Sequence, residues 1–194
     1  MSDFNHDYWK ELDTLEKFYY LGMLMGDGSV AAKSNVVAIR LSVEDIHWMQ
    51  NYKKNTGIDT KLNIVDLRPT INSVQCGVVK CSPEWKKDLA RYGVIPRKVG
   101  LKRLPLEQCT CDQEVSALLL GFHDADFSIC RSRTTGKYRA TMYGPKPLCE
   151  QVNRIFSGHL GIKPNSIRPH PTSDTLHQVA YSTPADLKRI RDFM

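Results

Sequence analysis

Two aspartates at the end of an apolar stretch have the type and spacing of residues that could bind a metal ion or catalyse a reaction. The stretch ALLLGFHDADFSI, residues 117–129, begins like an apolar helix and then places Asp124 and Asp126 around one alanine. The carboxyl end of a helix is partly negative, so a carboxylate there is disfavoured unless something binds it. Carboxylate oxygens are hard ligands that suit Mg²⁺, so this stretch is a candidate metal site.

The acidic stretch has a counterpart earlier in the chain. YYLGMLMGDGSV (19–30) and LLLGFHDADFSI (118–129) share an apolar run, a Leu-Gly pair and an aspartate at the same place. The two aspartates, Asp27 and Asp126, are 99 residues apart (126 − 27 = 99). An internal repeat of this length predicts a chain built from two similar halves.

Small residues recur at helical spacing in both stretches. Gly22 and Gly26 are four residues apart, and Gly121 and Ala125 repeat the pattern. Small residues spaced in this way share one helix face and let two helix backbones approach closely. The alternative explanations are chance and a helix C-cap at Gly26 or Gly28. If the two helices pack about a pseudo-twofold axis, their acidic ends meet, and divalent cations would offset the repulsion between the carboxylates.

The remaining pattern predicts an α+β protein in which each half reads helix, strand, strand, helix, strand, strand, helix. Helices expected over 43–58 and 146–162 close on Gly57 and Gly161, a C-terminal capping signal. Helices over 82–93 and 183–194 open with Ser-Pro or Thr-Pro, which is typical of an N-cap. Alternating runs between them predict hairpin strands, over 35–43, 60–67, 71–81, 126–133, 137–143, 165–171 and 176–182. Each half would then form an antiparallel sheet with helices on one side only.

The uncovered sheet face is expected to be basic. Lys137, Arg139 and Thr141 alternate on one side of their strand, and Arg131 and Arg133 share a face of the preceding one. A solvated sheet face is the plain interpretation. A two-stranded ribbon also fits the major groove of DNA, and such side chains read base edges there. Weaker candidates for nucleic-acid contacts are Arg40, Lys61, Asn63, Gln75, Arg168, His170, His177 and Gln178.

Composition favours an intracellular protein with an anionic partner. The formal charge is +6 at pH 7 over 194 residues, which suggests nucleic acid. No apolar run approaches the roughly 18 residues of a membrane span, and the N-terminus is neither a signal nor a transit peptide. The six cysteines show no C-x2-C pair, so free thiols are expected rather than a zinc site.

The motifs YLGMLMGDG and LLGFHDADF resemble the paired LAGLIDADG motifs of the single-chain homing endonucleases, and the resemblance extends from about Leu15 to Met194. It implies two pseudo-symmetric repeats that form a saddle of two antiparallel sheets, with the two motif helices packed at the centre. The expected organisation is an N-terminal extension (1–14), a first repeat (15–94), a linker (95–113) and a second repeat (114–194).

The resemblance also implies an activity. The last acid of each motif, Asp27 and Asp126, would bind catalytic Mg²⁺, with Mn²⁺ able to substitute, and the backbone carbonyls of Gly26 and Ala125 would assist. The expected product is a double-strand break with short 3′ overhangs, made by a monomer at a long asymmetric DNA target, as in intron homing. Ions bound there would polarise the phosphate and activate a water molecule.

Further residues follow from the resemblance. YGVIPRKVG is similar to the segment that carries a basic group near the attacking water, which places Lys98 there; a surface linker lysine is the alternative. Phe127 and Met25 depart from the motif, replacing its final glycine and its first acid. Asp124 keeps that first acid and is expected to support the ligands rather than bind metal. His123 is expected to be a packed core histidine rather than a base.

Two functions stay open at this point. The first is the site-specific endonuclease. The alternative is an intron RNA maturase or a non-cleaving DNA-binding regulator on the same scaffold. The presence of both Asp27 and Asp126 favours the nuclease, because a pure binder has no need of paired acids.

Overall fold

The computed structural model describes residues 4–68, 73–97, 103–133 and 135–194 and shows an α+β protein. Two compact units divide the chain. The first unit comprises Met1–Asp13 and Asp27–Arg97, and the second comprises Thr14–Gly26 and Lys98–Met194. The first motif helix therefore belongs with the second unit, because it packs on the second motif helix. Because of this packing, the boundaries of the two units differ from the repeat boundaries expected from sequence.

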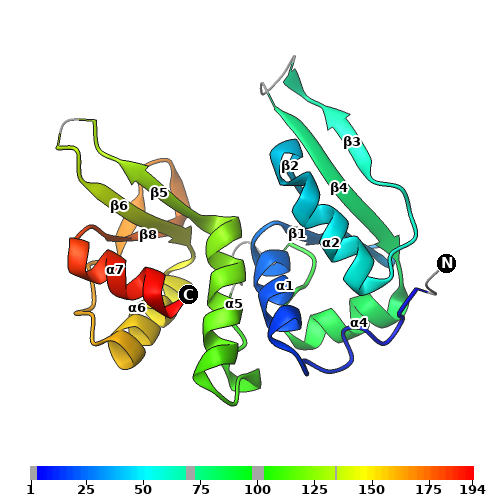
Figure 1. The fold of residues 1–194 in the computed structure, drawn as a ribbon, viewed down its shortest axis with the longest axis horizontal. Coiled ribbons are helices and arrows are strands. Elements are labelled where there is room, and N and C mark those ends of the chain that lie inside the picture. The colour runs from blue at the N-terminus through cyan, green and yellow to red at the C-terminus, as the bar shows by residue number, and fades with distance from the viewer. Residues whose placement is uncertain (1–3, 69–72, 98–102, 134) are drawn as a thin grey trace. The chain divides into compact units, whose positions relative to one another are not determined.

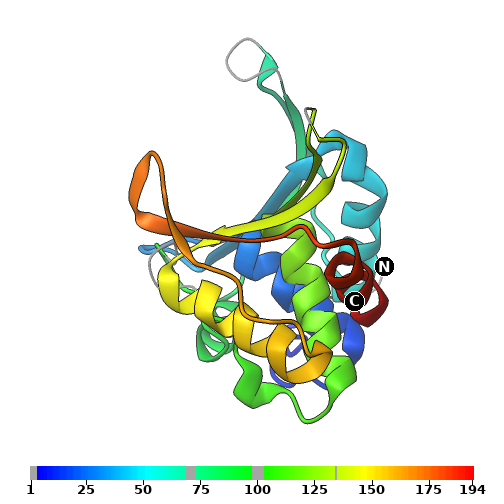
Figure 2. The ribbon, with the colours of Figure 1, turned by 90° about the vertical axis from the view of Figure 1, so that its left-hand side faces the viewer.

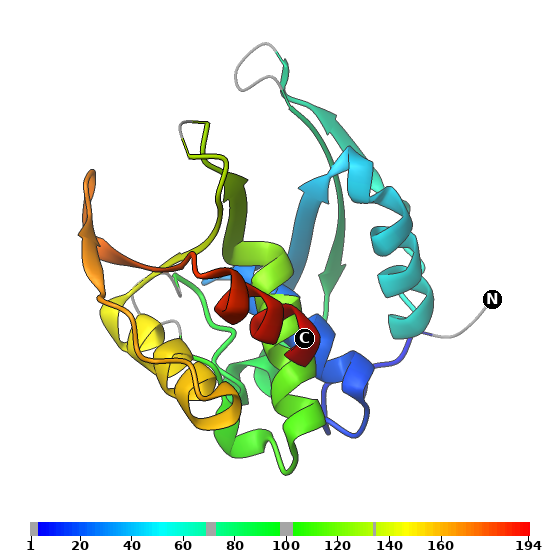
Figure 3. The same cartoon turned by 60° about the vertical axis from the view of Figure 1, so that its left-hand side comes forward.

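The first unit is a four-stranded antiparallel sheet in the order β1-β2-β4-β3 with helices on one face (Figure 1). Figure 3 shows α2 lying along one face of this sheet. The elements are β1 (Gly28–Val30), β2 (Val36–Ser42), η1 (Val43–Asp45), α2 (Ile46–Thr56), β3 (Asn63–Asp66), β4 (Val74–Cys81) and α4 (Pro83–Arg91).

The second unit repeats this plan, with sheet order β5-β6-β8-β7. Figure 2 shows α6 against one face of the sheet, while no helix of the described residues lies on the other. The elements are α1 (Leu15–Gly26), η3 (Leu106–Gln108), α5 (Asp112–Asp126), β5 (Phe127–Arg131), β6 (Tyr138–Gly144), α6 (Lys146–Leu160), β7 (Arg168–His170), β8 (Ser173–Tyr181) and α7 (Pro184–Phe193).

The expected order of elements in each half is confirmed, and local chemistry explains the boundaries. Gly57 and Gly161 end α2 and α6 in the left-handed region, with φ of 70° and 60°. Ser82 caps α4 by accepting a hydrogen bond from the Trp85 amide at 3.2 Å. Thr183 makes no such side-chain hydrogen bond at the start of α7. Of the expected Thr-Pro capping pattern, only the proline in the first turn is observed there.

The expected alternation along β2 is also confirmed. Val37, Ile39 and Leu41 are buried on the helix side, whereas Arg40 and Ser42 are exposed. The N-terminal segment is more than an extension, because Trp9 is fully buried against Trp85 of α4. Within the described residues, no helix is both long and apolar enough to cross a bilayer.

Candidate nucleic-acid interface

The two motif helices of the second unit touch backbone to backbone. A methyl group built on Gly22 would lie 2.2 Å from the carbonyl oxygen of Leu118, and one on Gly121 would lie 1.9 Å from that of Tyr19. Real Cβ atoms do not approach so closely, so only glycine fits at either position. The small-residue pattern therefore marks a helix–helix contact, as the spacing predicted.

The contact between the helices is reciprocal. Gly121 follows Gly22 by 99 residues (121 − 22 = 99), and Leu118 follows Tyr19 by the same number (118 − 19 = 99). Gly22 contacts Leu118, Gly121 contacts Tyr19, and Leu118 and Tyr19 are equivalent positions of the two repeats. This is the signature of a pseudo-twofold axis between α1 and α5.

The carboxyl ends of the two helices meet on this axis. A methyl group on Gly26 would lie 2.2 Å from Cβ of Ala125 and 3.4 Å from the carboxyl carbon of Asp126. The half-buried carboxylate of Asp126 therefore lies beside two helix ends that are partly negative. Asp27, which follows Gly26 directly in the chain, is exposed. A cation is the ligand that such an end would favour.

Asp124 and His123 differ in their surroundings from Asp126. Asp124 accepts a hydrogen bond from the Tyr19 hydroxyl at 2.9 Å. The His123 side chain is 13% exposed, and the centroid of its ring lies 4.7 Å from that of Phe127. Neither ring nitrogen of His123 has a hydrogen-bond partner among the described residues. His123 is thus mostly buried, as its interpretation as a packed histidine required.

The other parts of the expected catalytic set are less defined. Lys98 lies outside the described residues, so its expected place near the attacking water stays a prediction. Among the described residues, no three His, Cys, Asp or Glu side chains are grouped to hold an ion. Metal binding by Asp27 and Asp126 therefore stays a prediction.

The uncovered sheet face of the first unit carries three of the expected contact residues. Cross-strand partners share a face, and β2, β4 and β3 align Arg40, Gly77 and Asn63 in one row. The stem of Arg40 lies over Gly77, where a methyl group would be 2.8 Å from its Cγ. Gln75, opposite Ser42, is on the same face. Lys61 is exposed just before β3.

The uncovered face of the second unit is polar and basic. Tyr143, Gln178 and Arg168 form a cross-strand row through β6, β8 and β7. The His170 ring contacts that of Tyr143 edge-on at 5.3 Å. A hollow of about 300 Å³ opens on this face, lined by Arg139, Asn165, Ser166, Arg168, Gln178, Ala180 and Ser182. Arg139, Arg168 and Gln178 were expected here from sequence.

The face expected for Arg131 is wrong, whereas Arg133 and Lys137 lie outside the strands, so the face expected for them stays a prediction. Arg131 pairs with Tyr138 in the sheet and therefore lies on the helix side, where its Nε donates to the carbonyl of Gly136 at 3.0 Å. Arg133 lies beyond the end of β5. Lys137 precedes β6 and borders a pocket on the helix side.

Two further contact candidates need correction. His177 pairs with Gly144 and so shares the helix-facing side with the fully buried Val179, not the uncovered face. Thr141 is on the uncovered face but only 4% exposed.

Sequence reasoning missed several residues of the second uncovered face. Tyr143 is four residues after Arg139 in β6 and so lies on the same face, which the strand period could have shown. Asn165 and Ser166 precede β7, where no period applies. The backbone N–H of Asn165 donates a hydrogen bond to Oδ1 of Asn153 in α6 at 3.1 Å.

Comparison with known proteins bears on the fold. No protein-family model matches the sequence, and no curated protein matches it significantly. Solved structures do match. The LAGLIDADG domain of WhiA aligns with a TM-score of 0.60 at 10% identity, covering 97% of this chain and 86% of that one. A mesophilic variant of the homing endonuclease I-DmoI aligns with a TM-score of 0.57 at 18% identity, covering 91% and 92%.

A third neighbour is the meganuclease I-SmaMI, solved bound to an uncleaved DNA target with calcium ions. It aligns with a TM-score of 0.55 at 10% identity, covering 91% of this chain and 84% of that one. The fold is therefore the two-repeat LAGLIDADG fold. At such low identity the likeness shows the fold alone, and the fold is found both in endonucleases and in WhiA.

Proposed function

We propose that this protein is a site-specific DNA endonuclease that cleaves both strands of a long asymmetric target by metal-dependent phosphodiester hydrolysis. The observation that carries the proposal is the packing of Gly26 on Ala125, which sets Asp126 beside the end of α1. The next residue after that end is Asp27. An aspartate at the end of each motif helix, together with arginine and amide side chains on each uncovered sheet face, would serve the cleavage of a polyanion.

The residues at the helix ends fit a divalent cation. Asp126 and Asp27 would hold it, with the carbonyls of Gly26 and Ala125 as further oxygen ligands, and such a set suits Mg²⁺. When bound, the ion would polarise the phosphate and lower the pKa of a water molecule. The tight contact between the helices fixes the position of Asp126, because neither backbone can shift without a clash.

The sheet faces would provide binding and register. Arg168, Arg139 and Gln178 are side chains able to hydrogen-bond base edges in the major groove, and Arg40 and Asn63 are their counterparts in the first unit. The two faces differ in sequence, which favours an asymmetric target. That I-SmaMI and I-AabMI were solved on DNA supports duplex DNA as the partner.

The experiment is cleavage of a randomised duplex library with and without Mg²⁺. Wild type, Asp27→Asn and Asp126→Asn are compared, with Glu107→Gln as a matched control, because Glu107 is exposed on η3. The proposal expects metal-dependent cutting at one long sequence, lost in both Asn variants while DNA binding survives. Glu107→Gln should cut like wild type.

A non-cleaving DNA-binding role is the second candidate, and the fold shared with WhiA favours it. It predicts sequence-specific binding by wild type without cutting under Mg²⁺, Mn²⁺ or Ca²⁺, and equal binding by Asp126→Asn. That result would overturn the endonuclease proposal.

A further inference from the structure

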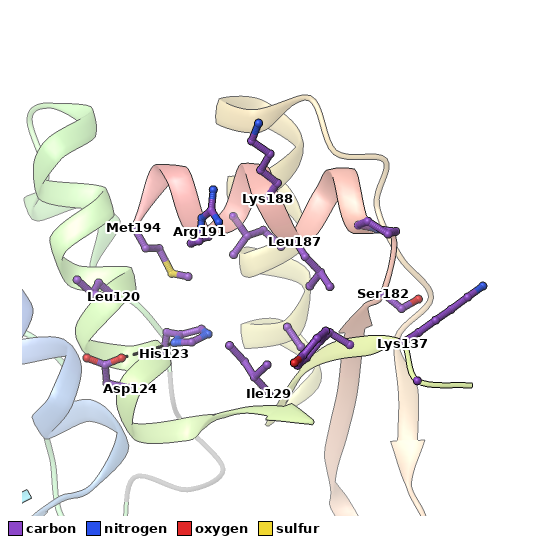
Figure 4. Close-up of a pocket in the computed structure, with 15 residues that line it drawn as sticks. Leu120, His123, Asp124, Ile129, Lys137, Ser182, Leu187, Lys188, Arg191 and Met194 are labelled. Atoms are coloured by element: carbon purple, nitrogen blue, oxygen red, sulfur yellow. Dashed lines mark ion pairs between the residues drawn. The ribbon is translucent and has the colours of Figure 1, made fainter. Parts of the chain in front are cut away.

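A pocket of about 800 Å³ lies on the helix side of the second sheet, away from the uncovered face. Figure 4 shows that its lining comes from α5, from the β5–β6 hairpin and from α7. Most of its walls are apolar, formed by Leu120, Ile129, Tyr138, Ala140, Pro184, Leu187, Ile190 and Met194. Its volume is in the range of sites that bind ligands.

Two large apolar side chains are left open to solvent at this pocket. Ile129 is 60% exposed and Tyr138 is 57% exposed. The residue equivalent to Ile129 in the first repeat is Val30 (129 − 30 = 99), which is only 9% exposed. The exposure is therefore a property of this repeat and not of the fold. Exposed apolar patches of this kind mark interaction sites.

The first unit shows how the same corner is otherwise closed. Lys86 of α4 donates from Nζ to the carbonyls of Ala31 at 2.9 Å and Ser34 at 2.7 Å, which ties the helix to the β1–β2 turn. Lys86 is three residues after Pro83, and the residue three after Pro184 in α7 is Leu187. A leucine cannot bind those carbonyls. An apolar side chain thus replaces a polar clamp, and it lines the pocket.

One end of the pocket is formed by His123, whose two ring nitrogens are buried. His123 lines it, and neither ring nitrogen has a hydrogen-bond partner; Nδ1 is 3.6 Å from Asp124, which is too long for a hydrogen bond. Because both nitrogens are buried, His123 contributes the surface of its ring to the pocket wall rather than a hydrogen bond to an occupant.

The rim of the pocket is cationic. Figure 4 shows Lys188 and Lys137 extending outward from it, and neither forms an ion pair with any residue that the structure describes. Arg191 is the third cation and pairs with Asp192. The acid in the lining, Asp124, already accepts from Tyr19. The charge that complements this rim is negative.

We propose that this pocket is a docking site for a short peptide segment of a partner protein, with apolar side chains that fill the pocket and acidic residues that face Lys137 and Lys188. Apolar walls disfavour a nucleic-acid backbone, and cations on two different elements, the β5–β6 hairpin and α7, fit several acidic side chains of a peptide rather than one anionic headgroup. The docking role does not depend on cleavage, because the pocket lies on the helix side of the sheet.

The test is selection of peptides on the full chain. A displayed library of random dodecapeptides is panned on wild type, and enriched peptides are labelled and titrated by fluorescence anisotropy. Ile129→Glu, Leu187→Lys and Lys188→Glu are compared with two matched controls. Ile64→Glu changes an isoleucine that is 56% exposed in the first unit, and Lys87→Glu changes the lysine equivalent to Lys188.

The docking proposal expects enriched peptides that combine apolar and acidic residues. Their binding should weaken about tenfold or more in the three pocket variants, which corresponds to about 1.4 kcal/mol, and stay unchanged in both controls. Circular dichroism checks folding, and Lys188→Glu, a change at the exposed rim, keeps the test valid if Ile129→Glu unfolds. The proposal is overturned if no peptide is enriched, or if the enriched peptides bind the pocket variants as well as wild type. It is also overturned if Ile129→Glu abolishes self-association or binding of an RNA duplex instead.

Discussion

Gly121 of α5 lies directly against the backbone of Tyr19 on α1, so that a methyl group at Gly121 would fall 1.9 Å from the Tyr19 carbonyl oxygen. Two helix backbones in contact cannot make room for a side chain without separating. Separation would move the ends of both helices, where Gly26 meets Ala125 and Asp126. The stability of this crossing and the position of the acid are therefore coupled.

Gly121→Ala should destabilise the protein by at least about 2 kcal/mol, because the clash is with backbone atoms and overpacking costs roughly 1–3 kcal/mol. The melting temperature should fall by about 4–8 °C in a chain of this size. Gly158→Ala in α6 is the control, since nothing lies within 4 Å of its added methyl group. That change should stabilise by up to about 1 kcal/mol through helix propensity. Equal melting temperatures for the two variants would contradict the close helix contact.

Gln151→Ala should be among the most costly single changes outside the apolar core. The Gln151 amide accepts from the Leu104 N–H at 2.9 Å and donates to its carbonyl at 2.7 Å, and all these groups are buried. Removing the side chain leaves the buried Leu104 N–H unsatisfied, at about 1–3 kcal/mol, whereas the Leu104 carbonyl still accepts from the Leu106 N–H at 2.9 Å. Urea denaturation should show a free energy of unfolding that is lower by about 1–3 kcal/mol. Gln113→Ala, at an exposed position of α5, should change stability by less than about 0.5 kcal/mol.

Arg168→Ala should weaken binding of the DNA target by about 1–3 kcal/mol if the uncovered face reads bases. Arg168 lies in a cross-strand row with Gln178 and Tyr143 and lines the hollow on that face. Fluorescence anisotropy at several salt concentrations separates a base contact, which changes sequence preference, from a phosphate contact, which lowers the salt slope by about one. Arg154→Ala is the control, because Arg154 is exposed on α6, on the covered side. A loss for Arg154→Ala as large as for Arg168→Ala would rule out this face.

The repeated pattern was sufficient to predict the fold from sequence. The glycine spacing, the capping residues and the strand alternation are local signals, and each half repeats them, so errors in one half are checked by the other. Gly22 and Gly121 could be assigned to a helix contact because their steric requirement is absolute. Asp126 could be placed because it ends the helix that the pattern defines.

The face of each strand residue was harder to predict. Arg131 shares its parity with Phe127 and Ile129, and His177 shares its parity with Val179 and Tyr181. These apolar neighbours point to the helix side. Their pattern indicated the correct face, but the prediction gave more weight to the charge or polarity of Arg131 and His177. The pocket beside Leu187 could not be predicted, because it depends on how far α7 stands from the hairpin. That spacing is set by packing and not by any local pattern.

Cys149 should make the protein less stable in alkaline solution. Burial raises the pKa of this thiol to about 11 from an ordinary value of 9.0. Below pH 9 the thiol is neutral in both folded and unfolded chains. Above pH 9 the unfolded chain ionises first, so stability is lost as the pH rises from about 9 to 11.

Melting temperatures measured in reducing buffer at pH 8, 9, 10 and 11 test this expectation. The decline should be steeper for wild type than for Cys149→Ala, whatever the starting stability of the variant. Some decline should persist in the variant, because burial also raises the pKa of Cys109 to about 12. Cys130→Ala removes an exposed thiol and should follow the wild-type curve. Parallel curves for wild type and Cys149→Ala would mean that Cys149 ionises as readily in the folded chain as in the unfolded one.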